Sequence, residues 1–198
     1  NGGETWYAPP LPWCQFYRIN VDNRTPYWVS GTIQDIGALA GPSNSLNRRG
    51  ISHYEWYPIG GGEAGYTAHH PQDPNIIYAG EYAGIITRFD YRNRQAPHVG
   101  VYPHRTSGEA ADLRYRFRWP APILISPHDP NLVYHAGNIL FASRDGGVTW
   151  TALSGDLTRN DKSKQGWSGG PITGDNTSAE HYCTISAIAE SPRQPGVL

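Results

Sequence analysis

Hydrophobic residues in this chain fall in short runs that are closed by Gly, Pro, Asn or Asp. In residues 73–80 and 129–136, for example, an Asp-Pro-Asn turn leads into mostly apolar residues. Long runs with helical spacing are absent, whereas β-branched and aromatic residues separated by turn formers are typical of short strands. The pattern predicts an all-β fold of antiparallel strands.

A unit made of a strand, a turn rich in Asp, Asn and Pro, and a second strand recurs four times. We take the second proline of each turn as a marker. These four prolines are separated by about 50 to 65 residues, which is the length of a four-stranded β-propeller blade. Four blades alone would leave open sheet edges, so we expect a fragment of a larger propeller, completed by further chain or by another copy. The predicted blade segments are about 7–59, 60–104, 121–153 and 182–198, with insertions at 105–120 and 154–181.

The second and third repeats allow individual strands to be placed, whereas residues 37–50 of the first repeat are rich in Gly, Ser, Asn and Pro and are expected to be irregular. The expected strands of these two repeats lie near 65–70, 75–80, 84–90 and 97–102, and near 121–126, 131–136, 138–143 and 149–153.

Residues 143–150 form a recognisable piece of turn chemistry. The carboxylate of Asp145 can accept hydrogen bonds from local N–H groups, Gly146 and Gly147 can take positive φ angles, and Trp150 can pack on the returning strand. Residues 1–6 repeat the pattern with Asn1 in place of the Asp. We expect the Asp145 turn to join the third and fourth strands of its repeat.

The same residues match the Asp-box, the Ser-x-Asp-x-Gly-x-Thr-Trp signature of propellers in sialidases, sortilin-type receptors and tandem-propeller xyloglucanases. Residues 59–65, followed by His70-Pro71-x-x-Pro74, resemble the opening blade of xyloglucanase-type propellers. The whole chain resembles the sortilin-related, glycosyl-hydrolase-like repeat proteins of bacteria. The resemblance implies a structural role for the Asp-box residues Ser143, Asp145, Gly147, Thr149 and Trp150.

A glycosidase of this kind would need two carboxylates at strand ends or loops, working as acid and base. In the xyloglucanase pattern an Asp follows the Tyr-Ala strand, and Tyr82 takes that place here, with Glu81 beside it. Asp35 stands in an Asp-Ile-Gly step of the first repeat and is the best single candidate. Glu63 follows because its glycine neighbours could let a ligand approach the backbone. The alternative for Asp35 is a turn residue, and for Glu63 a carboxylate that caps backbone donors.

Other candidate binding residues are His69 and His70, which strand alternation sends to opposite faces, and Tyr82. Residues 113–119 alternate strictly between a Leu or an aromatic residue and an Arg. This predicts an amphipathic strand or extended arm with a solvated Arg face; alternatively, Arg116 and Arg118 meet a carboxylate-bearing ligand or an acidic partner surface. A sialidase would need an arginine triad, and only Arg18 sits in a comparable step, so we reject that activity.

The composition of the chain limits the classes of partner that it could bind and the compartment in which it could act. The net charge of −1 provides no global field for nucleic acid or anionic membranes, and no apolar run is long enough to insert into a bilayer. The scarcity of Lys and two Asn-x-Ser/Thr sequons, at Asn23 and Asn176, favour export to the periplasm, cell surface or extracellular space. Cys14 and Cys183 fit two buried thiols better than a disulfide. We expect no cofactor and no metal.

We therefore expect an exported, non-catalytic propeller module that binds a protein or glycan through its loops and central channel. The alternative is a glycoside hydrolase that acts on a polysaccharide, with Asp35 as its acid or base.

Overall fold

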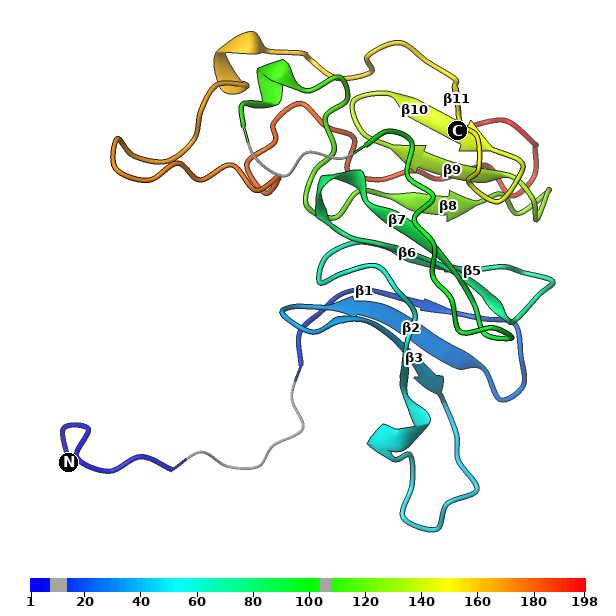
Figure 1. Ribbon diagram of the computed structural model, residues 1–198. Helices are drawn as coiled ribbons and strands as arrows, with labels where there is room; N and C mark the ends of the chain where they lie inside the picture. The colour runs from blue at the N-terminus through cyan, green and yellow to red at the C-terminus, as the bar shows by residue number, and fades with distance from the viewer. Residues whose placement is uncertain (8–13, 104–107) are drawn as a thin grey trace.

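The computed structural model describes residues 1–7, 14–103 and 108–198, and in these ranges the chain forms three antiparallel β-sheets (Figure 1). The first sheet holds β1 (Phe16–Val21), β2 (Trp28–Ile33), β3 (Gly37–Pro42) and β4 (Tyr57–Pro58). The second holds β5 (Thr67–His69), β6 (Ile76–Gly80) and β7 (Ile86–Asp90). The third holds β8 (Ile123–Ile125), β9 (Val133–Ala136), β10 (Leu140–Ser143) and β11 (Thr151–Ala152). Strands pair in chain order in every sheet, which confirms the all-β prediction.

Helical structure in the described ranges is limited to four short 3₁₀ turns: η1 (His53–Glu55), η2 (Tyr82–Gly84), η3 (Ala110–Asp112) and η4 (Lys162–Lys164). Of these, η1 begins with a capping box, in which Ser52 Oγ accepts from the Tyr54 N–H and the Glu55 carboxylate accepts from the Ser52 N–H. No helix in the described part of the chain is long and apolar enough to span a bilayer.

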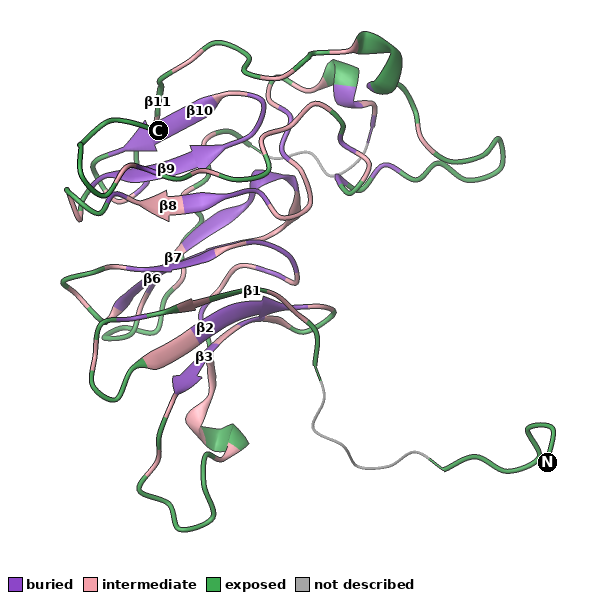
Figure 2. Cartoon of the chain, turned by 180° about the vertical axis from the view of Figure 1, so that it is seen from behind, coloured by how far each residue is buried: buried purple, intermediate pink, exposed green. Residues whose placement is uncertain are grey.

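The three sheets stack face to face, and the first strand of the middle sheet, β5, contacts both β1 and β8 (Figure 1). One core lies between the first and second sheets and a second core between the second and third; their buried residues are Ala38, Ala40, Ile59, Ile77, Ala79 and Phe89, and Ala68, Ile76, Tyr78, Ile86, Ile123 and Val133. Because β6 is covered on both faces, all its residues are buried (Figure 2). Each such Ile contributes about 1.5–3 kcal/mol to the stability of the stack.

The strands predicted for the second and third repeats are confirmed except for the last strand of the second repeat. Near 97–102 the chain forms only an isolated bridge between His98 and Thr87, with backbone hydrogen bonds from the Val99 N–H to Ile86 and from the Arg88 N–H to Pro97. Pro97 has no N–H to donate, which is compatible with an irregular sheet edge. Residues 105–107, at the start of the first predicted insertion, lie outside the described residues, as do 8–13 and 104 at the predicted blade limits.

The prediction that residues 37–50 are irregular was wrong for 37–42, because these residues form β3 and pair with β2 along its length. Glycine is required here by a neighbouring ring: a Cβ on Gly41 would lie 2.3 Å from a carbon of the Trp56 side chain. The small residue therefore makes room for the indole against the strand, while Ala38 and Ala40 of β3 are buried in the core between the first and second sheets.

The fourth repeat is only partly formed. Ile185 and Ile188 pack on the outer face of the third sheet, but residues 185–198 contain no strand. Cys14 is exposed and Cys183 is partly exposed, and both thiols are free, so the prediction of two buried thiols was wrong. Within the described residues the sheets do not close into a ring or barrel.

Candidate functional site

Several connections gather at one end of the sheets, which we call the loop end. They are residues 34–36 between β2 and β3, 59–66 before β5, 81–85 between β6 and β7, and 137–139 between β9 and β10, all on the left in Figure 1. The turn of residues 144–150, between β10 and β11, lies at the opposite end. The predicted carboxylates Asp35, Glu63 and Glu81 are therefore all at the loop end.

Asp35 and Glu63 are joined by the side chain of Gln34. Gln34 Nε2 donates to Asp35 Oδ1 at 2.7 Å and to Glu63 Oε2 at 2.6 Å, and the Tyr17 hydroxyl contacts the amide oxygen of Gln34. Two carboxylate oxygens that share one donor nitrogen are closer together than the roughly 6.5 Å that an inverting glycosidase needs for its water. The pair does not have inverting geometry.

Glu63 Oε2 also accepts the backbone N–H of Asp35 at 3.0 Å. Asp35 has a φ of 62°, a left-handed conformation that Asp tolerates in tight turns, and its side chain is exposed. Glu63 thus holds the β2–β3 turn in place, which is the capping role that the sequence left open. Asp35 is a turn residue in this arrangement.

The glycines around Glu63 serve packing between chain segments. The Gly61 N–H donates to Thr87 Oγ1 at 2.8 Å and the Gly62 N–H to the Gly80 carbonyl at 3.1 Å. A Cβ on Gly62 would lie 2.2 Å from the side chain of Glu81. The backbone space that was expected to admit a ligand is occupied by the end of β6 and by Glu81, so that part of the prediction was wrong.

Tyr82, which stands where the enzyme pattern has its Asp, lies in η2 at the loop end. Its ring stacks on that of Trp119, with the centroids 5.0 Å apart and the planes 11° from parallel. The next residue, Ala83, has a φ of 58° and donates its N–H to Ser178 Oγ at 3.0 Å. Tyr82 therefore joins the second sheet to the long segments that follow it.

The two histidines lie at the other end of β5, away from the loop end. His70 Nδ1 accepts from the backbone N–H groups of Gln72 and Asp73, at 3.3 and 3.0 Å, and caps the β5–β6 turn. His69 is buried beside Asp22, and burial lowers its pKa to about 4. His70 precedes the two N–H donors by two and three residues. This spacing is a signal from which the cap could have been predicted.

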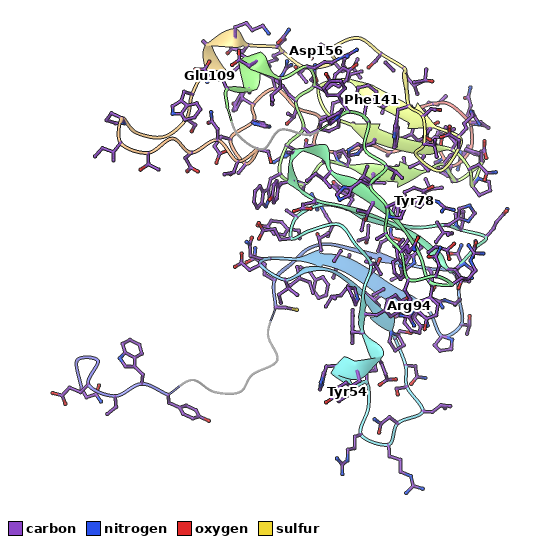
Figure 3. All side chains as sticks on the ribbon, in the orientation of Figure 1. Tyr54, Tyr78, Arg94, Glu109, Phe141 and Asp156 are labelled. Carbon is purple, nitrogen blue, oxygen red and sulfur yellow. The ribbon has the colours of Figure 1, made fainter. Side chains whose placement is uncertain are left out.

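The expectation of a solvated Arg face at 113–119 was wrong for Arg116. These residues form no strand, and Arg116 is only 5 % exposed. Its guanidinium lies 2.5 Å from Asp156 Oδ2 and also donates to the Cys183 carbonyl at 3.3 Å. Burial alone would raise the pKa of Asp156, but hydrogen bonds from Thr158, Asn138 and Arg116 lower it on balance. Asp156 is labelled in Figure 3.

Arg116 also donates to the Thr158 hydroxyl, and both Thr158 and Cys183 line a cavity that the sequence did not reveal. The cavity has a volume of about 830 Å³ and is walled by residues 157–161 and 179–187, with Arg118 and Lys164. It is formed by segments far apart in the sequence, and the predicted insertion at 154–181 carries no periodic pattern. Asp35, Glu63 and Glu81 are not among the residues that line this cavity.

The Asp145 turn joins the third and fourth strands of the third sheet, as predicted. Asp145 Oδ1 accepts from the Thr149 N–H at 2.9 Å, and Oδ2 from the Thr149 hydroxyl at 2.6 Å. Ser143 Oγ accepts from the Gly147 N–H at 2.8 Å and contacts Asp145 Oδ1 at the same distance. The Thr149 hydroxyl, its N–H and Ser143 together lower the pKa of Asp145 to about 2. Both oxygens of the Asp145 carboxylate therefore accept hydrogen bonds from within the turn.

The turn is attached to the second repeat through Trp150. The indole Nε1 donates to the Val99 carbonyl at 2.8 Å, and a Cβ on Gly147 would lie 2.7 Å from Val99 Cβ. We call the contact between Trp150 and Val99 the tryptophan anchor. Its position far from the loop end supports a purely structural role.

Two further observations bear on the expected chemistry. No three His, Cys, Asp or Glu side chains converge as metal ligands in the parts of the chain that the structure describes. Asn176 of the second sequon is 7 % exposed, and its Nδ2 donates to the Gly108 carbonyl, so it is not accessible to a glycosylating enzyme in the folded chain.

Comparison of the sequence with protein-family models and with curated proteins found no match.

Proposed function

We propose that this chain is part of an exported Asp-box β-propeller that binds a glycan or protein ligand at its loop end without catalysis. The stack of three meandering sheets, with their first strands adjacent, supports the propeller arrangement. The Asp-box lies between the third and fourth strands of its sheet, where blades of such propellers carry it. Further blades, from the same or another chain, would cover the open faces of the first and third sheets.

The observation that carries a binding role is the cavity beside the loop end, which is lined by Thr158 and Cys183, two residues that the buried Arg116 contacts. Arg116 is buried whereas the Asp156 side chain is 22 % exposed, and the pair offsets the cost of desolvating the guanidinium. Here it holds residues 156–158 against residues 116 and 183, and so shapes the wall of a cavity large enough for a few sugar rings or amino acids. Recognition by shaped loops is the usual task of such an assembly.

The alternative is a glycoside hydrolase, and the proximity of Asp35, Glu63 and Glu81 favours it over other enzymes. A retaining mechanism needs carboxyl groups about 5–5.5 Å apart. However, Glu63 is already tied to the Asp35 backbone and to Gln34. A nucleophile or acid would have to leave these bonds during the reaction, which weighs against catalysis.

One experiment tests both functions. The purified chain is titrated with a panel of soluble polysaccharides and peptides by calorimetry, and the same mixtures are assayed for new reducing ends. We expect saturable binding of at least one ligand and no hydrolysis. Hydrolysis that is lost in Asp35→Asn but kept in Asp175→Asn, an exposed acid elsewhere, would overturn the non-catalytic proposal.

A further inference from the structure

The cavity beside the loop end is lined by more cationic than anionic side chains. Arg118, Arg159 and Lys164 line it, and none of them forms an ion pair with a carboxylate in the described part of the chain. By contrast, the neighbouring Arg116 is fully engaged with Asp156. With three cations against the two carboxylates of Asp161 and Glu180, the lining keeps a net positive charge, which favours a ligand of opposite charge.

The two acidic residues of the cavity, Asp161 and Glu180, are used within their own turns. Asp161 Oδ1 accepts from the N–H and the hydroxyl of Ser163, at 3.1 and 2.7 Å. Glu180 Oε2 accepts the Thr177 N–H at 2.7 Å. These hydrogen bonds hold both carboxylates toward their turns. The charge of Asp161 still acts on Arg159 and Lys164, but neither forms an ion pair with it, so their cationic groups can bind an anion.

His181 adds a neutral acceptor at the same wall. The residue is 5 % exposed, its Nδ1 lies 2.8 Å from the Phe117 carbonyl, and its buried Nε2 has no hydrogen-bond partner. Burial lowers its pKa and keeps the ring neutral. Because a carbonyl can only accept, Nδ1 carries the hydrogen and Nε2 presents a lone pair. An acceptor suits a hydroxyl group of a ligand and does not suit a carboxylate.

The remaining lining favours a saccharide over a peptide. The hydroxyls of Thr184 and Ser186 make no hydrogen bond within the described residues, and the Tyr182 ring is 55 % exposed beneath the Lys164 ammonium at 5.3 Å. The walls at 157–164 and 179–187 contain no strand, so they offer no edge for pairing with an extended peptide.

We propose that this cavity binds a saccharide segment that carries carboxylate groups, with Arg118, Arg159 and Lys164 on the carboxylates and His181 on a sugar hydroxyl. The inference rests on the proposed binding function and specifies its ligand class as an acidic, uronate-type polysaccharide.

The test uses polygalacturonate and its fully methyl-esterified form, which share a backbone and differ in charge. We expect the acid form to bind the chain about tenfold or more tightly than the ester, with affinity falling as salt is raised. Arg159→Ala, at an exposed position, and Arg118→Ala should each weaken binding of the acid form by about tenfold. Arg48→Ala, an exposed residue on the β3–β4 connection, is the charge-matched control and should bind like the parent.

The outcomes separate this inference from the proposed function. Equal binding of the acid and ester forms, or no loss in Arg159→Ala, would overturn the acidic ligand class while leaving glycan binding intact. Tighter binding of poly-glutamate than of polygalacturonate would overturn the saccharide assignment and favour a peptide ligand. If no ligand of any class binds, the proposed function itself fails. A thermal melt of each variant establishes that lost binding does not reflect unfolding.

Discussion

The Asp145 turn and the N-terminal turn are built from nearly the same residues but are fixed in different ways. Gly146 and Gly147 have φ angles of 77° and 91°, and Gly2 and Gly3 have 66° and 87°. Trp150 is partly buried and donates to Val99, in another repeat, whereas Trp6 is 90 % exposed and donates at 2.9 Å to Gly3 of its own turn.

The comparison separates local turn chemistry from its contribution to the fold. Two successive positive-φ glycines and a side-chain acceptor are sufficient to form the turn in both places. Only the tryptophan anchor connects such a turn to a neighbouring sheet. We therefore expect substitutions in the two turns to change stability very differently, although the turns themselves are alike.

The largest effect should come from removing the indoles. Trp150→Ala deletes the hydrogen bond to Val99 and the packing of the ring against the cores of the second and third sheets. We expect it to lower the free energy of unfolding by about 3 kcal/mol, measured by urea denaturation. Trp6→Ala is the matched control and should leave the urea midpoint unchanged. An equal loss in both variants would mean that the N-terminal turn is also anchored.

A smaller effect should come from the glycines. Gly147→Ala puts a Cβ at a φ of 91° and 2.7 Å from Val99 Cβ, so it combines backbone strain with overlap. We expect a loss of about 2 kcal/mol in the free energy of unfolding. Gly3→Ala has similar backbone strain, but its nearest neighbour is at 3.5 Å, on Trp6, and the global transition should not move. A shift of that transition in Gly3→Ala would contradict the comparison.

The smallest effect should be the dependence on pH that Asp145 confers. The folded-state pKa of Asp145 is about 2, below the ordinary value of 3.8 for an Asp side chain. The unfolded chain therefore binds more protons between these values, and the stabilisation is present above about pH 4 and is lost as the pH falls toward 2. Asp145→Asn should lose stability at pH 6 and converge on the parent near pH 2. Asn1→Asp should follow the parent at every pH, and a constant gap for Asp145→Asn would refute this account.

Local patterns in the sequence were sufficient to predict the Asp145 turn and the strands of the second and third repeats, except the last strand of the second repeat. In each case the turn residues and the residues that pack beside them are near neighbours in the chain. The strand β3 was missed because its burial comes from residues that lie later in the chain: Trp56 packs on Gly41, and the second sheet covers Ala38 and Ala40. The glycines of residues 37–42 suggested an irregular segment, whereas Gly41 makes room for the Trp56 ring.

The candidate site was less predictable for the same physical reason. Asp35, Glu63 and Glu81 were placed at one end of the sheets, but the hydrogen bond from Asp35 to Glu63 could not be read from spacing. The burial of Arg116 depends on Asp156, forty residues later in the chain. The cations of the cavity converge only because two segments without a periodic pattern fold together, so no local signal indicated them.

The tryptophan anchor joins Trp150 to a residue that comes earlier in the chain. Trp150 binds a carbonyl that precedes it by about fifty residues, and nothing in the contact depends on residues that follow it. During synthesis on the ribosome, the third sheet can therefore attach to the second as soon as Trp150 has emerged. Repeats secured in this backward manner can fold in order of translation, each on a neighbour that is already in place.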